Sequence, residues 1–317
     1  MGAEYRDEPC KVALNRVKGM SFRWSLNPYM GCAHRCTFCF VRAFERLADR
    51  PSDDGYGTSI RVKTNLVEVL RRELGRRSWK REQVAVGTAT DPYQPAEGRW
   101  RLTRGAIVAL GEAATPFGLI TRGPLIVRDV DVLADAARQA DVSVTFSVPT
   151  LDHEIWRLTE PGTAPPRQRL RALRVLSDAG IRTSVGMAPI LPGLTDRPDL
   201  LEDVVRAARD AGATGVWANL LYLKPGTREH FLDHLARDWP ELLPTYEQLY
   251  ARGAYVAKDV AEPVKTKVAD LRRRYDVTDR RTVRLEPATP GSAVEGVPIG
   301  ALVQAPGQLP LLPPGVS

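Results

Sequence analysis

The chain has 317 residues, of which 43% are hydrophobic and 26% are charged, proportions that suit a globular protein with a sizeable core. It has no run of about 18 apolar residues and no apolar export segment at its start, which argues against a membrane span and against secretion. The net charge of +7 permits contact with nucleic-acid phosphates, although an arginine-rich composition does not demonstrate it. We therefore expect a monomeric cytoplasmic protein that keeps its cysteines reduced.

The chain begins its regular structure close to a cysteine-rich loop. Residues 18–28 are extended in character, with interleaved aromatic side chains, and they end at a proline, which predicts a first strand. After the cysteine-rich loop we expect a short helix at 41–49, a loop at 51–57 and an edge strand at 60–64. Asn65 is placed to cap the helix that follows.

From this point strands and helices alternate. Short apolar runs predict strands at 84–90, 117–121, 142–148, 183–190 and 215–222. Amphipathic patterns predict helices at about 66–74, 103–113, 127–139 and 200–211, with a further helix-rich connection that ends at Gly180. This alternation is typical of a parallel sheet covered by helices. Together with residues 18–28 it predicts a β/α barrel, or part of one, with six strands.

Three of the four cysteines, Cys32, Cys36 and Cys39, share one short loop with the spacing C-x3-C-x2-C, and Cys10 lies upstream. Thiolates select zinc, copper(I) or iron–sulfur clusters. A structural zinc ion and a cubic iron–sulfur cluster each take four ligands, so three cysteines leave one position open for chemistry. A zinc knuckle completed by His34 or Cys10 is the alternative, although His34 would have to bend back sharply inside the loop.

Phe38 stands directly before the last of these cysteines, and with it the loop resembles the signature of the radical S-adenosylmethionine (SAM) superfamily. The resemblance implies a partial (β/α)6 TIM-like barrel over residues 18–225. It implies that Cys32, Cys36 and Cys39 hold a 4Fe–4S cluster whose open iron binds SAM, with Phe38 near the adenine. Such enzymes cleave SAM reductively to a 5′-deoxyadenosyl radical that abstracts hydrogen from a substrate. Their electron comes from a donor such as flavodoxin or ferredoxin.

Further candidates for SAM contacts stand at the carboxyl ends of the predicted strands, where α/β folds place their sites. Thr90 and Asp91 follow the second core strand, and Asp91 either accepts from the SAM ammonium group or serves as a turn or helix N-cap residue. Arg122 follows the third strand and either meets the SAM carboxylate or is a solvated charge. Ser147, on the fourth strand, is a candidate for the ribose or an ordinary core hydroxyl. The segment around Ile190 resembles the one that contacts the adenine through its backbone.

The run from Asp91 to Glu97, Asp-Pro-Tyr-Gln-Pro-Ala-Glu, resembles the branch that includes spore photoproduct lyase and DNA-repair-photolyase-like proteins. Spore photoproduct lyases use a cysteine on this side of the cleft as hydrogen donor. This chain has no cysteine beyond Cys39, so we do not expect repair of thymine dimers. The substrate does not transfer with the fold, and nucleic acid is the first candidate, with a peptide or a small metabolite as alternatives. A non-catalytic zinc or iron–sulfur protein that binds nucleic acid is the alternative from another class.

Other charged groups carry weaker signals. Glu160, Arg167 and Arg169 either face the cleft or begin a helix. His230 and His234 share one helical face without the glutamate of a zinc-protease motif, which favours a solvated helix face. For the whole chain we expect an N-terminal segment at 1–17, the barrel at 18–225, a helical extension at 226–286 and a flexible Pro/Gly/Ala-rich tail at 287–317.

Overall fold

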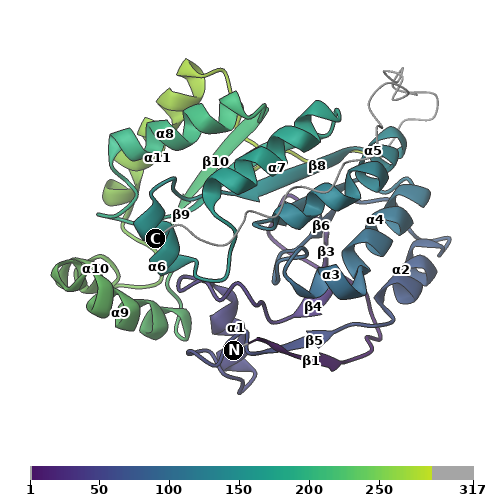
Figure 1. Ribbon diagram of the computed structural model, residues 1–317, viewed down its shortest axis with the longest axis horizontal. Helices are drawn as coiled ribbons and strands as arrows, with labels where there is room; N and C mark the ends of the chain where they lie inside the picture. Colours follow the sequence, from purple (N-terminus) through teal and green to yellow (C-terminus); the bar gives the residue numbers. More distant parts are fainter. Residues whose placement is uncertain (1, 288–317) are drawn as a thin grey trace, which may run out of the picture.

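Six parallel strands in chain order form the centre of the molecule, and one antiparallel strand extends them (Figure 1). The computed structural model describes residues 2–287. The sheet has the order β10-β9-β8-β7-β6-β3-β2, and its strands are β2 (Leu14–Arg16), β3 (Trp24–Leu26), β6 (Val84–Val86), β7 (Phe117–Thr121), β8 (Val142–Ser147), β9 (Arg182–Ile190) and β10 (Gly215–Leu220). The predicted partial β/α barrel of six strands is confirmed. Within the described residues β10 and β2 are the two ends of the sheet.

The parallel strands use their two faces differently. Phe117 of β7 and Phe146 of β8 are buried and lie outside the cavity lining. Their neighbours in the same strands, such as Ile120 and Thr145, line an internal cavity instead. This alternation follows from the two-residue period of a strand, which sends successive side chains to opposite faces of the sheet. One face therefore packs under the helices and the other forms the wall of the cavity.

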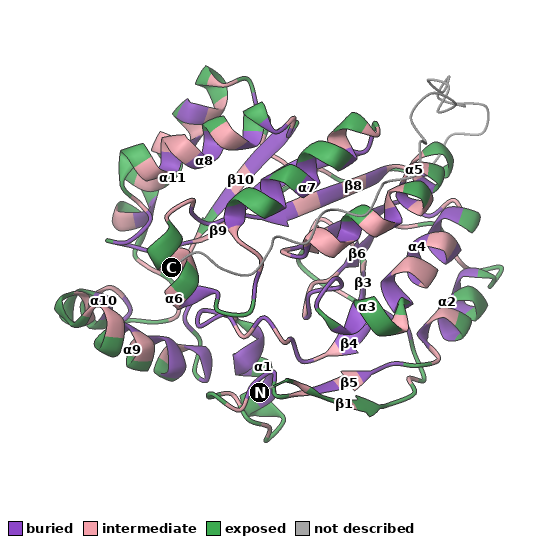
Figure 2. Ribbon diagram, in the orientation of Figure 1, coloured by how far each residue is buried: buried purple, intermediate pink, exposed green. Residues whose placement is uncertain are grey.

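Helices cover the outer face of the sheet, with exposed residues on their solvent side (Figure 2). The helices before the last strand are α1 (Val41–Leu47), α2 (Leu66–Leu74), α3 (Ala96–Trp100), α4 (Leu102–Glu112), α5 (Val130–Gln139), α6 (His153–Thr159), α7 (Pro166–Asp178) and α8 (Pro198–Asp210), with the 3-10 turn η1 (Pro124–Asp129) before α5. The buried residues of α8, Leu201, Val204, Val205 and Ala208, recur at helical spacing and explain why this helix packs on the sheet.

A second, small sheet has the order β1-β5-β4 and is built from the N-terminal part of the chain (Figure 1). Its strands are β1 (Glu4–Asp7), β4 (Tyr29–Met30) and β5 (Ser59–Val62). The prediction of an edge strand at 60–64 was wrong, because β5 is the central strand, parallel to β1 and antiparallel to β4. Asn65 stands at the N-cap position of α2, as predicted, but its side chain makes no capping hydrogen bond. Its side chain instead accepts from the backbone N–H of Cys10 at 2.8 Å and donates to the Cys10 carbonyl at 3.1 Å.

The C-terminal part of the described chain is helical, as expected, and then returns to the sheet. Its elements are α9 (Thr227–Asp238), the 3-10 turn η2 (Pro240–Leu242), α10 (Leu243–Leu249) and α11 (Lys258–Arg274). Residues 276–287, which we call the C-terminal strap, run along the β10 edge, where Val216 N donates to the Thr278 carbonyl at 2.8 Å. The strap then reaches Gln83, whose Oε1 accepts from Leu285 N at 3.0 Å. The predicted tail lies, except for Pro287, outside the described residues.

Candidate functional site

The three clustered cysteines open onto one large cavity. They belong to the loop at residues 31–40, here called the cysteine loop, between β4 and α1. Cys32, Cys36 and Cys39 all line a cavity of about 870 Å³. All three thiols are free of disulfide bonds, and the first two are buried. The hydroxyl of Tyr56 lies 3.7 Å from Cys39 Sγ. The cavity extends along the inner face of the sheet from the cysteine loop to Gln83 at the opposite end.

Polar side chains of the Asp-Pro-Tyr-Gln-Pro-Ala-Glu run hold the cysteine loop in place. Gln94 is completely buried; its Nε2 donates to the Gly31 carbonyl at 3.1 Å, and its Oε1 accepts from Ala33 N at 2.9 Å. Thr90, just before the run, donates from Oγ1 to the same Gly31 carbonyl at 2.7 Å and accepts from Gln94 Nε2 at 2.8 Å. Because a buried backbone group without a partner is costly, these contacts fix the path of the loop.

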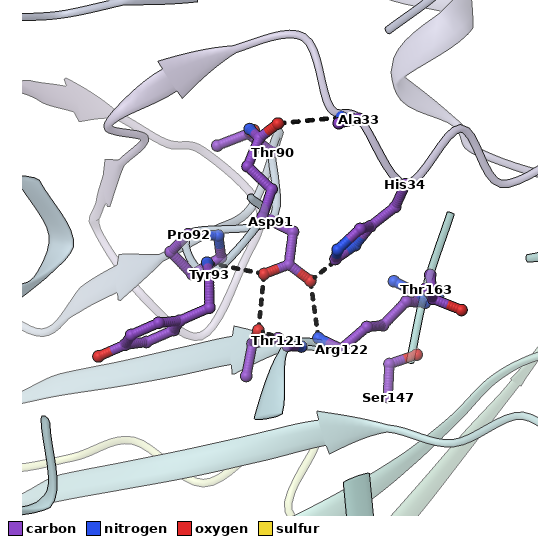
Figure 3. Close-up of polar contacts among 12 residues, drawn as sticks. Ala33, His34, Thr90, Asp91, Pro92, Tyr93, Thr121, Arg122, Ser147 and Thr163 are labelled. Atoms are coloured by element: carbon purple, nitrogen blue, oxygen red, sulfur yellow. Dashed lines mark hydrogen bonds and ion pairs between the residues drawn. The ribbon is translucent and has the colours of Figure 1, made fainter. Parts of the chain in front are cut away.

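Asp91 is the centre of a buried network (Figure 3). Its Oδ1 accepts from Tyr93 N at 2.8 Å and from Thr121 Oγ1 at 2.6 Å, and its Oδ2 accepts from Arg122 N at 2.7 Å. His34 Nδ1 of the cysteine loop lies 3.2 Å from Oδ2. Burial opposes ionisation of Asp91, but His34 and the hydrogen bonds outweigh it and lower its pKa to about 2. Asp91 is therefore an ionised turn residue that joins the cysteine loop to the end of β7.

Glu97, the last residue of the run, is also fully buried. Its Oε2 accepts from the Tyr29 hydroxyl at 2.5 Å and from Thr103 N at 2.9 Å. Its Oε1 lies 3.0 Å from Arg128 Nη2. Tyr29 directly precedes the cysteine loop in β4, so this carboxylate fixes the loop entrance to the start of α4.

Arg122 lines the cavity and belongs to a buried charge group with Glu160 and Arg169. Arg122 Nε lies 2.6 Å from Glu160 Oε1, and Arg169 Nη2 lies 2.8 Å from Glu160 Oε2. Arg169 also donates to the Ser147 carbonyl at 2.8 Å. Burial raises the pKa of Glu160, but the two guanidinium groups outweigh it and lower that pKa below its usual value. Burial alone would lower the pKa of Arg122, but Cys36 and Glu160 outweigh this effect, so the pKa of Arg122 is raised. Glu160 and Arg169 are not part of the cavity lining; Arg169 lies in the first turn of α7, and the two side chains form a buried pair.

Two glycines let neighbouring segments approach the cysteine loop closely. Gly57 has φ +78°, and a Cβ there would lie 2.3 Å from the Cys32 carbonyl oxygen. A Cβ on Gly162 would lie 2.5 Å from the Ala33 carbonyl oxygen. A methyl group at either place would displace the cysteine loop.

The remaining predicted site residues lie behind the cavity wall. The guanidinium carbon of Arg122 lies 5.7 Å from the centre of the Phe38 ring, which is buried. Ser147 Oγ donates to the Ala188 carbonyl at 3.3 Å. Ile190 is fully buried, and its carbonyl accepts from Leu221 N at 2.9 Å. The structure thus brings together the cysteines, Thr90, Asp91 and Arg122 on the cavity.

Sequence reasoning missed the tethers Gln94 and Glu97 and the tyrosine beside Cys39. Gln94 and Glu97 belong to a motif that was identified by family resemblance. The sequence of that motif does not indicate which atoms these side chains contact. The buried pairing of Glu97 with Tyr29 spans 68 residues of chain, so no local pattern could have indicated it.

Comparison with known proteins decides the family. The profile of the radical SAM superfamily matches residues 26–204. The chain belongs to the radical SAM superfamily. This radical SAM protein is 40% identical to the uncharacterized protein Rv2578c of Mycobacterium tuberculosis (strain ATCC 25618 / H37Rv) over 304 residues, 95% of this chain and 88% of the relative.

A more distant relative and a solved structure agree with this assignment. The radical SAM protein is 25% identical over 256 residues to the radical SAM Nalpha-GlyT isomerase of Pseudomonas phage M6, with 78% of this chain and 50% of the relative covered. It also superimposes on a spore photoproduct lyase with bound AdoMet and dinucleoside spore photoproduct, with a TM-score of 0.65 at 14% identity. That superposition covers 86% of this chain and 79% of the lyase and shows a shared fold. No helix in residues 2–287 is long and apolar enough to cross a membrane.

Proposed function

We propose that the chain is a radical SAM enzyme that cleaves SAM reductively and abstracts hydrogen from a substrate in the cavity. The observation that carries the proposal is the convergence of Cys32, Cys36 and Cys39 on a cavity of about 870 Å³ in a chain of this superfamily. The donor set fits a 4Fe–4S cluster, because three free thiols of one loop face one space and leave a side open. When bound, the cluster and SAM would supply a 5′-deoxyadenosyl radical from an electron given by a donor such as flavodoxin or ferredoxin.

The surrounding residues divide into binding and positioning groups. We assign Arg122 to the SAM carboxylate, because it lines the cavity and its charge is maintained beside Glu160. Thr90 and Asp91 have their oxygens engaged by protein donors, so we assign them to hold the cysteine loop and Arg122 in preference to a direct contact with SAM. Phe38, Ser147 and Ile190 would support the adenosine side of the pocket from behind its wall.

The test of the reaction is anaerobic reconstitution with iron and sulfide, followed by dithionite and SAM, with 5′-deoxyadenosine as the measured product. Cys36→Ala should abolish the product, because a cluster ligand is lost. Cys10→Ala is the matched control and should retain it, since Cys10 lies outside the cavity lining. The alternative outcome is that the chain takes up no iron but binds zinc, and that Cys36→Ala loses this zinc. That result would indicate a non-catalytic zinc protein.

For the substrate we propose single-stranded nucleic acid. Phe40 and Phe44 line the cavity and remain 45% and 50% exposed, with ring centres 5.9 Å apart. Exposed aromatic rings beside a cationic cavity suit stacking of an extruded base. Arg35 and Arg280 contribute positive charge to the same cavity lining. The dinucleoside bound to the structurally similar lyase supports this choice of substrate class.

The substrate proposal is tested by fluorescence anisotropy with labelled single-stranded oligonucleotides at several salt concentrations. The double variant Phe40→Ala, Phe44→Ala should weaken binding by about 1–3 kcal/mol per stacked base. Leu47→Ala is the control: it is 83% exposed on the same helix and is not part of the cavity lining. Equal affinity of both variants, or no salt-dependent binding, would redirect the search to a peptide or a small metabolite.

A further inference from the structure

A second group of metal-type ligands lies on α9, outside the cavity. His230 and His234 are one helical turn apart, with ring centres 4.2 Å apart. The expectation of a solvated helix face was wrong, because His230 is only 6% exposed and the loop at 51–57 lies against this face. That loop brings the carboxylate of Asp54 to both rings. Among the described residues, this is the group of His, Cys, Asp and Glu side chains whose ligand atoms gather within 4.8 Å of one another.

The distances within this group do not correspond to hydrogen bonds. Asp54 Oδ1 lies 4.0 Å from His230 Nδ1 and 3.9 Å from His234 Nε2. Hydrogen bonds between such atoms need about 2.7–3.2 Å. Two ligands of one zinc ion, each about 2.0–2.2 Å from the metal, lie roughly 3–4 Å apart. The observed spacing therefore suits atoms that share an ion.

The ring of His234 is oriented by a neighbouring carbonyl. His234 Nδ1 lies 2.9 Å from the His230 carbonyl oxygen. A carbonyl only accepts, so Nδ1 carries a proton, which leaves Nε2 as the ring nitrogen that can bind a metal ion. A backbone carbonyl that orients an imidazole in this way is the usual support of a metal-binding histidine.

We propose that Asp54, His230 and His234 bind one divalent transition-metal ion, of the zinc type, at a site separate from the cysteine loop. Two imidazole nitrogens and one carboxylate oxygen form a ligand set that zinc accepts, with the remaining position open to water. Asp54 is 85% exposed at its side chain, so it can adjust to complete the geometry.

The ion would join two segments that both touch the cysteine loop. On one side, the loop at 51–57 carries Tyr56 beside Cys39, and Arg42 donates to the Ser52 carbonyl at 2.9 Å. On the other side, Thr227 Oγ1 at the start of α9 donates to the Cys39 carbonyl at 3.0 Å. Asp54 lies on the first of these segments and His230 on the second, so the ion would link the two segments that contact Cys39.

The experiment uses the full chain with its iron–sulfur cluster reconstituted, so that the cysteines do not compete for the probe. Zn²⁺ is added in small excess, free ion is removed by gel filtration, and zinc and iron are measured by plasma mass spectrometry. We expect about one zinc per chain in addition to the cluster iron, and a melting temperature that rises with Zn²⁺. Asp54→Ala and His234→Ala should each weaken zinc binding by about tenfold or more while the iron content stays unchanged.

His153→Ala is the matched control, because His153 is an exposed histidine on α6, outside this group, and zinc retention should be unaffected. Asp54→Ala keeps the test decisive even if His234→Ala folds poorly, since the Asp54 side chain is exposed. The proposal is overturned if the wild-type chain retains no zinc, or if Asp54→Ala retains as much as the wild type. Either result leaves the proposed SAM chemistry untouched, because that is read out by 5′-deoxyadenosine.

Discussion

Glu160 shows how one buried carboxylate determines whether a cation can line the cavity. It is 1% exposed and lies between Arg122 and Arg169. Removing one partner of a buried ion pair costs about 3–5 kcal/mol, because the remaining charge is left without compensation. We expect Glu160→Gln to lower the free energy of unfolding in urea by about that amount.

The control for this variant is Glu112→Gln. Glu112 pairs with Arg71 at 3.2 Å, but both side chains are more than half exposed. An exposed pair contributes about 0–1 kcal/mol, so this change should leave the unfolding midpoint nearly unchanged. Equal effects of the two substitutions would contradict a special role for the buried group.

Asp91 predicts a pH dependence with a defined direction. Its pKa falls from 3.8 to about 2 in the folded chain. The folded value is lower than the unfolded one, so the stabilisation is complete above about pH 4 and is lost as the pH falls toward 2. A shift of this size corresponds to about 2–3 kcal/mol. In metal-free protein, Asp91→Asn should therefore lose roughly this much stability at pH 7 and progressively less below pH 4.

Urea titrations at a series of pH values would measure this convergence of wild type and variant. Asp135→Asn serves as control, because Asp135 and its partner Arg138 are exposed on α5. Its stability difference from wild type should be small and independent of pH. A gap for Asp91→Asn that stays constant down to pH 2 would show that the carboxylate does not stabilise the fold through its charge.

At the scale of elements, the approach of the β5 side to the cysteine loop depends on Gly57. Its positive φ, and the 2.3 Å that would separate a Cβ at this position from the Cys32 carbonyl oxygen, leave no room for a side chain. We expect Gly57→Ala to cost about 2 kcal/mol or more and to displace Cys32, so that the chain loses most of its iron. Iron and sulfide per chain after anaerobic reconstitution, with the melting temperature, measure both effects.

Gly98→Ala is the matched control. Gly98 lies within α3, and a Cβ there would have no neighbour within 4 Å. Alanine favours a helix over glycine by about 1 kcal/mol, so this variant should be as stable as wild type or more so, with full iron content. If Gly57→Ala holds as much iron as Gly98→Ala, the cysteine loop is more tolerant than the structure indicates.

The same scale shows what the sequence could and could not reveal. The six parallel strands were predictable because each is a short apolar run followed by an amphipathic helix, a signal carried by local residues. β1 was missed because Glu4–Asp7 has three exposed residues of four, and it exists through its pairing with β5. The cysteine loop was predictable from spacing. The partners of Asp91 and His230 were not, because they come from distant segments that only the fold brings together.

At the scale of the whole molecule, the C-terminal strap connects the β10 end of the open sheet to its middle. Thr278 lies beside Gly215 of β10, and Leu285 N bonds to Gln83 next to β6. Leu285 is 3% exposed and forms part of the cavity wall. Truncating such a leucine costs about 2 kcal/mol or more through lost burial and the space it leaves. We therefore expect Leu285→Ala to destabilise the chain by this amount in urea unfolding.

If the strap stabilises the sheet as a unit, Leu285→Ala should also change the dynamics of the strands. In Leu285→Ala, amide hydrogen exchange should become faster in the strap itself and also in β6 and β3, which are distant from Leu285 in the sequence. Thr282→Ala, at an exposed position of the same strap, should change neither stability nor exchange. If Leu285→Ala accelerates exchange in the strap alone, the strap is a local cover of the cavity. If exchange also becomes faster in β6 and β3, the strap stabilises the sheet and completes the cavity wall that a substrate would meet. The barrel then depends on residues 276–287, which lie beyond β10 and the helices α9 to α11 in the sequence.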